Sequence, residues 1–127
     1  MRINKVITFC FLSLGASCSS MFHVIDNYIV CNEYDNNQLD CNPAYKDSPF
    51  VEYVKSIMWN SNTIVVNQQL PNGHQNWFFV IAKCETLHCH CLDSLLGPFS
   101  QEERDSILAI RGIDTLKMER KVWRTPY

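Results

Sequence analysis

Apolar and polar side chains alternate in the second half of the chain, as they do in β-strands with one exposed face. The first such run is "FVEYVKSIMW" (50–59), and its phase changes near 54–56, where the sequence predicts a β-bulge or a break. Its alternating apolar positions are Val51, Tyr53, Ile57 and Trp59.

Two further strands are predicted on either side of a turn. Residues 63–69 are rich in β-branched side chains, and residues 77–82 are apolar on both faces, which places the second run in the middle of a sheet. The polar residues 60–62 and the "PNG" at 71–73 supply the turns, because glycine and asparagine tolerate a positive φ.

A short helix is predicted at residues 101–111. Ser100 and Glu103 have the spacing of a capping box, and Gly112 is placed to end the helix in the left-handed conformation. The helical positions expected to face inward are Ile107, Leu108 and Ile110.

The pattern before residue 50 is weaker. Residues 23–31 alternate enough for one strand, whereas residues 32–49 are rich in Asn, Asp and Pro and are expected to be irregular. Residues 18–49 are thus interpreted as a polar tether with one strand, followed by a single-domain core at 50–127. With a closing strand at 114–123, the sequence predicts an α+β fold of two layers, an antiparallel sheet of four or five strands with one C-terminal-half helix packed on it.

Residues 1–17 have the pattern of an export signal. Two basic residues precede an apolar run (6–14) that is too short to span a bilayer, and small residues follow it. The segment "LSLGASC" resembles the lipobox of bacterial lipoproteins, in which Cys18 would carry the lipid. Gly15 stands where that box usually has an aliphatic residue, so ordinary cleavage before Cys18 is the alternative.

Removal of the leader would leave 110 residues with nine basic and 13 acidic side chains, a formal net charge of −4 with neutral histidines. This balance argues against a nucleic-acid ligand and suits a basic protein partner. The late "KMERKVWR" (117–124) is interpreted as a solvated face. The lipobox resemblance implies an exported protein on the periplasmic side of the bacterial envelope, anchored by lipid. Ser19, rather than Asp, after Cys18 resembles the class of lipoproteins directed to the outer membrane.

Five cysteines remain once the leader and Cys18 are set aside. Exported cysteines usually pair, because the periplasm is oxidising. A bridge between the first two would tie down the irregular segment; a second would lie within the later cluster or link the two groups. The disulfide candidates are Cys31, Cys41, Cys84, Cys89 and Cys91.

The segment "CETLHCHC" is also a candidate metal centre, since thiolate and imidazole are ligands of zinc and copper(I). Side chains alternate between the two faces of an extended segment, and no second half-site occurs, so the spacing favours disulfides. The alternative function is therefore a periplasmic zinc- or copper-binding protein; in the main interpretation no cofactor is expected. The metal-ligand candidates are Cys84, His88, Cys89, His90 and Cys91.

The patterns "WN…IVV", "WFFVI" and "GPFSQEER" between residues 54 and 112 resemble uncharacterised small lipoproteins of the bacterial envelope. The resemblance covers about half of the chain. It implies the strand–strand–helix order and the envelope setting, and it brings no active site.

No nucleophile elbow, zinc-protease helix or phosphate loop occurs in the sequence. The sequence therefore predicts a non-enzymatic protein that binds an envelope or secreted protein, for example as an immunity protein or an inhibitor. A hydrolase would need a catalytic pair assembled only by the fold. Aromatic residues often anchor protein interfaces. The interface candidates are Trp59, Trp77, Tyr53 and Trp123.

Overall fold

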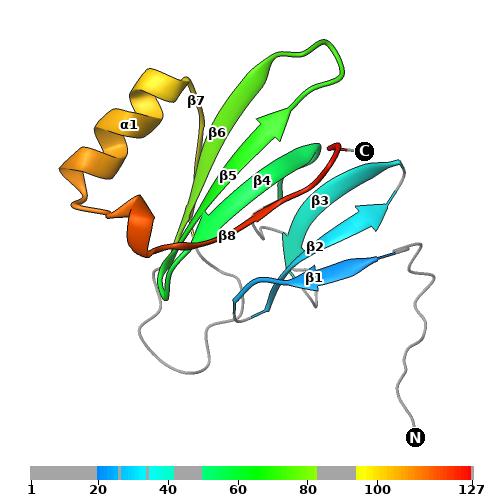
Figure 1. Cartoon of the computed structure of the whole chain (residues 1–127), viewed down its shortest axis with the longest axis horizontal. Coiled ribbons are helices and arrows are strands. Elements are labelled where there is room, and N and C mark those ends of the chain that lie inside the picture. Colours follow the sequence, from blue (N-terminus) through cyan, green and yellow to red (C-terminus); the bar gives the residue numbers. More distant parts are fainter. Residues whose placement is uncertain (1–19, 26, 34, 42–49, 83–93, 127) are drawn as a thin grey trace, which may run out of the picture.

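The computed structural model describes residues 20–25, 27–33, 35–41, 50–82 and 94–126. Within these residues the chain forms two antiparallel β-sheets, one α-helix and one short 3-10 helix (Figure 1). The α+β class expected from the sequence is confirmed, with a second sheet added to it.

The larger sheet has five strands in the order β7-β6-β5-β4-β8, and every neighbouring pair is antiparallel. Its strands are β4 (Val54–Trp59), β5 (Thr63–Gln69), β6 (Gln75–Ile81), β7 (Ser94–Phe99) and β8 (Glu119–Val122). The β5 prediction is confirmed residue for residue. The predicted bulge is present, because the register of β4 against β5 shifts between Val54 and Ser56. β6 lies inside the sheet as expected.

One strand of this sheet was not predicted. β7 has the sequence "SLLGPF", and glycine and proline are both depleted in strands. It pairs with β6 at the edge of the sheet, where a proline without an N–H group is tolerated. The predicted closing strand is shorter than expected, because residues 115–117 form the 3-10 helix η2 (Thr115–Lys117) and only β8 is extended.

The helix α1 (Gln101–Ile110) has the predicted capping box. The Ser100 side chain accepts from the backbone N–H of Glu103 at 3.1 Å, and the Glu103 carboxylate accepts from the backbone N–H of Ser100 at 2.8 Å. These two bonds satisfy two amides that a helix start leaves without partners. Gly112 follows the helix with φ 65°, a conformation that glycine adopts without strain.

The inward face of α1 differs from the expectation at one position. Leu108 is buried and Ile107 half-buried, but Ile110 is 84% exposed. Arg104 completes the inward stripe instead, with its guanidinium 4.1 Å from the ring centroid of Trp77. Positions 104, 107 and 108 lie on one helix face at spacings of three and four, and position 110 is off that stripe.

The segment that was expected to be irregular (32–49) supplies one whole strand and the end of another in the smaller sheet, so that expectation is wrong. The single strand expected at 23–31 is divided between two strands by a turn. Three antiparallel strands lie in the order β1-β2-β3. They are β1 (Met21–His23), β2 (Tyr28–Glu33) and β3 (Asn36–Cys41). The polar run Asn36, Asn37 and Gln38 is buried in β3, because tertiary contacts supply partners that a turn would have taken from water.

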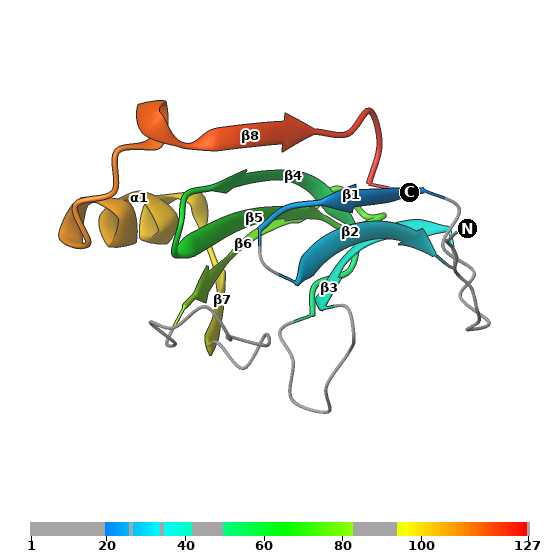
Figure 2. The same ribbon diagram turned by 90° about the horizontal axis from the view of Figure 1, so that it is seen from below.

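The two sheets and the helix make three layers, not two (Figures 1 and 2). The smaller sheet packs on one face of the larger sheet, and α1 covers the opposite face over β6 and β7. One apolar core lies between the sheets and a second lies under the helix. Leu39 of β3 and Val51 also exchange backbone bonds of 2.8 and 3.1 Å, which link the edge of the smaller sheet to the segment entering β4.

Asn37 joins the two sheets and the C-terminal segment. Its backbone N–H donates to the carbonyl of Pro126 at 2.7 Å. Its side-chain amide donates to the carbonyl of Thr125 at 2.9 Å and to that of Val54 at 3.3 Å. Its side-chain oxygen accepts from the amide of Asn32 at 3.0 Å. One buried side chain therefore serves β2, β4 and the end of the chain.

Replacing this side chain should destabilise the fold. Asn37→Ala leaves two carbonyls and one amide without their partner, which should lower the free energy of unfolding by about 2–3 kcal/mol. Urea denaturation measures the change. The matched control is Asn72→Ala, which removes a 2.8 Å bond to the backbone N–H of His74 at an exposed turn and should cost less than about 1 kcal/mol. Equal losses in the two variants would contradict the assigned role.

Candidate interaction surface

Several candidates from the sequence lie outside the described residues. They are the lipidation candidate Cys18 and the cluster Cys84, His88, Cys89, His90 and Cys91. Among the described residues, no three histidine, cysteine or acidic side chains come together as a metal ion would need. None of the described helices has the length and apolarity required to cross a membrane.

The cysteines of the smaller sheet do not bond to each other. Cys31 lies opposite Gln38 in the register of β2 and β3, and Cys41 lies opposite Tyr28. Three residues along a strand correspond to roughly 10 Å, beyond the reach of a disulfide. This register excludes the Cys31–Cys41 pairing, which is one of those that the sequence leaves open. Both cysteines are disulfide-bonded, and all other cysteines of the chain lie outside the described residues.

Two of the aromatic interface candidates contribute to the cores. Trp59 is 8% exposed and belongs to the core between the sheets. Trp77 is half-buried under α1, where Arg104 lies over its ring. Neither ring is available as a protruding anchor for a partner.

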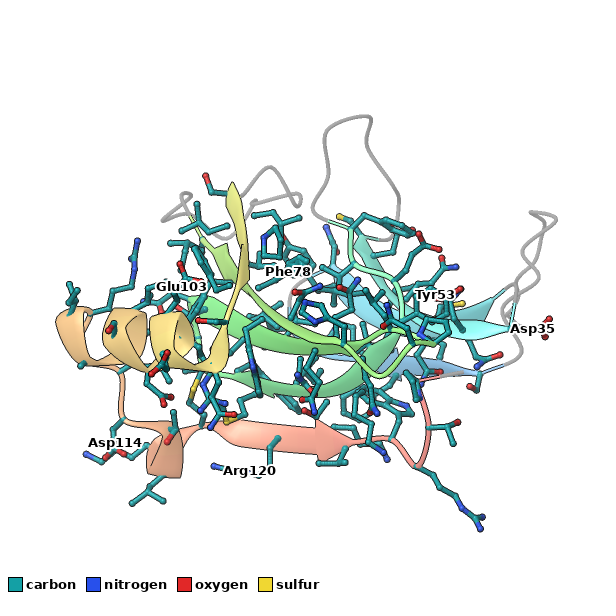
Figure 3. All side chains as sticks on the ribbon, turned by 90° about the horizontal axis from the view of Figure 1, so that it is seen from above. Asp35, Tyr53, Phe78, Glu103, Asp114 and Arg120 are labelled. Carbon is teal, nitrogen blue, oxygen red and sulfur yellow. The ribbon has the colours of Figure 1, made fainter. Side chains whose placement is uncertain are left out.

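The other two candidates are half-buried at the junction of the sheets. The ring of Trp123 packs edge-on against Phe22 with their centroids 5.8 Å apart. The ammonium of Lys121 lies 5.7 Å from the ring centroid of Phe22 and 5.9 Å from that of Trp123. Tyr53 has φ 54°, donates its backbone N–H to the side-chain oxygen of Asn36 at 3.2 Å, and lies beside the smaller sheet (Figure 3).

The strongest surface feature lies around β8. All four residues of this strand are exposed, and so are Leu116 and Lys117 of η2 and Arg124 after the strand. Two of them are aliphatic: Leu116 is 89% and Val122 is 62% exposed. We name this set the β8 surface: Leu116, Lys117, Glu119, Arg120, Lys121, Val122 and Arg124.

Charge is segregated toward the β8 surface. It carries four basic side chains and one acidic side chain, although the whole chain has a formal net charge of −2. Arg120 projects at the outer side of β8 (Figure 3), and its guanidinium donates to the carbonyl of Thr115 at 2.6 Å. The expectation that an acidic surface would suit a basic partner does not apply here, since the β8 surface is basic and partly apolar.

The position of β8 depends on the segment that follows it. The ammonium of Lys55 donates to the carbonyl of Trp123 at 2.8 Å and to that of Arg124 at 2.7 Å. The backbone N–H of Trp123 donates to the carbonyl of Lys55 at 2.9 Å. Together with Asn37 of β3, these bonds tie residues 123–126 to both sheets.

Sequence reasoning treated the β8 surface as a solvated strand face. The signal that could have identified it was the excess of basic residues after position 110 combined with exposed aliphatic positions. The sequence could not show that β8 forms the edge of the sheet, because strand order is set by contacts far apart in the chain.

Removing the Lys55 ammonium should loosen β8. Lys55→Met keeps an apolar stem of similar length but loses both carbonyl contacts, which should cost about 1 kcal/mol at this half-exposed position. Hydrogen exchange at the backbone amide of Trp123 should become faster. Lys117→Met, at an exposed position of η2, is the control and should leave that exchange rate unchanged. Equal exchange rates in the two variants would show that the Lys55 contacts do not hold β8 in place.

Comparison with protein-family models, curated proteins and solved structures finds no match for this chain. Its function has to be inferred from the chemistry and the positions of its own side chains.

Proposed function

We propose that this chain is an exported, non-enzymatic lipoprotein that binds a protein partner in the bacterial envelope. The observation that carries the binding role is the β8 surface, which combines two exposed aliphatic side chains, Leu116 and Val122, with four basic ones. Exposed aliphatic groups with surrounding charge are typical of protein-binding patches. The charge sign makes an acidic partner the complementary one.

The export part of the proposal has separate support. Residues 1–17 have the order of charge, apolar run and small residues that defines an export signal. The disulfide-bonded state of Cys31 and Cys41 is consistent with it, because disulfides persist mainly in oxidising compartments such as the periplasm. One specific form of the function is an immunity protein or inhibitor that neutralises an acidic secreted protein.

The binding role can be tested by capture from the native envelope. The tagged wild-type protein should retain a stoichiometric partner at low salt and release it as salt rises, because charge complementarity is screened. The double variant Arg120→Glu and Lys121→Glu reverses two charges at exposed positions and should lose the partner. Glu102→Lys, on exposed α1, is the charge-changing control and should retain it. Absence of any stoichiometric partner from the wild-type capture would count against the proposal.

The anchor can be tested by intact mass of the protein extracted from its own envelope. Denatured mass should show a lipid on Cys18 and a chain that lacks residues 1–17. Cys18→Ser should shift the protein from the detergent phase to the aqueous phase. A wild-type mass with an unmodified Cys18 would instead support ordinary cleavage and remove the lipid anchor from the proposal.

A further inference from the structure

The backbone of β8 has one edge paired with β4 and, among the described residues, no strand on the other edge. Antiparallel strands alternate residues that exchange backbone bonds with residues that do not. The N–H of Trp123 donates to the carbonyl of Lys55, which places residues 119, 121 and 123 in bonded pairs with β4. The backbone groups of the intervening residues, Arg120 and Val122, therefore point away from β4.

The pairing of β4 with β5 supports the same assignment. Asn60 donates its N–H to the carbonyl of Thr63, so the even-numbered residues of β4 exchange bonds with β5. The odd-numbered residues Ile57 and Trp59 are left to bond β8. The two ladders thus fix the same direction for the outward groups of β8.

No described strand lies beyond β8. It is the last strand of the order β7-β6-β5-β4-β8, and Figure 2 shows it along the outer side of the molecule. Its four residues are all exposed. The outward N–H and C=O groups of Arg120 and Val122 can therefore meet a strand from another molecule, as in recognition by β-strand addition.

The basic side chains of β8 favour an acidic partner strand over a second copy of this chain at the unpaired edge. A second copy of the chain would bring the same four basic side chains and single acidic side chain against themselves, and like charges directly opposite each other on paired strands are destabilising. Lysines on an edge strand commonly prevent such self-pairing. An acidic strand would meet opposite charges at Arg120 and Lys121 and could place an aliphatic residue beside Val122.

We infer that the open edge of β8 binds an extended, acidic segment of a partner protein by β-strand addition. This inference rests on the proposed binding function and deepens it. Arg120 and Val122 supply the outward backbone groups. Lys117, Lys121 and Arg124 add the charge that selects an acidic strand.

The test uses a capped peptide, Glu-Thr-Val-Glu-Glu-Thr-Val-Glu, and a matched peptide with lysine at the four glutamate positions. The full mature protein is titrated while backbone amide signals and their hydrogen exchange are recorded. The acidic peptide should bind and protect the amides of Arg120 and Val122, and its affinity should fall as salt rises. The lysine peptide should not bind.

Val122→Pro isolates the backbone contribution. Proline removes an N–H that points away from β4, and such positions on edge strands tolerate proline. The variant should keep its fold and bind the acidic peptide about tenfold more weakly. Val122→Thr, which keeps the N–H, is the matched control and should bind like the wild type. If Val122→Pro fails to fold, the double variant Arg120→Glu and Lys121→Glu tests the inference instead, because its reversed charges should make it prefer the lysine peptide.

Four results would overturn the inference: no binding of the acidic peptide to the wild type, equal binding by folded Val122→Pro, protection confined to amides away from β8, or concentration-dependent self-association through β8. Its failure can be distinguished from failure of the proposed function. If wild type and Val122→Pro capture the same partner from the envelope equally well, the proposed binding function stands and strand addition at the edge of β8 is excluded.

Discussion

The buried amide of Asn37 is the constraint on which the arrangement of the layers depends. It connects the smaller sheet, the first residue of β4 and the carbonyl groups at the end of the chain. A buried polar group without partners is costly, so the two sheets can meet closely here only in the register that satisfies this side chain. An apolar core alone would allow the sheets to slide relative to each other.

The same contacts determine where the β8 surface lies. The segment after β8 is bonded to both sheets, because Asn37 and Lys55 donate to its carbonyl groups. β8 is thereby positioned against β4, with its second edge directed outward. The contact between the two sheets and the position of the β8 edge thus depend on the same set of hydrogen bonds.

The charge distribution determines which kind of strand can pair with β8. Basic side chains gather around β8 in a chain that is acidic overall. On an edge strand such charges discourage pairing with another copy and leave pairing with an acidic strand favourable. Exposed Leu116 and Val122 supply apolar area that charge alone would lack.

Local chemistry was sufficient to predict part of the fold. The alternation of residues 63–69, the phase change at 54–56 and the capping box at Ser100 and Glu103 act over a few residues, and all three are confirmed. The inward direction of Ile110 was wrong, because the choice of helix face depends on the sheet that it covers.

The sequence by itself determined the strands of the central hairpin, the helix with its capping box, and the α+β class, because each follows from neighbouring residues. Only the tertiary structure decided that the Asn-rich segment forms a buried strand, that β7 exists and that β8 is an edge. It also decided that Cys31 and Cys41 do not pair with each other. These outcomes depend on partners far away in the chain, whose contacts outweigh the turn propensity of Asn and the strand-breaking tendency of Gly and Pro.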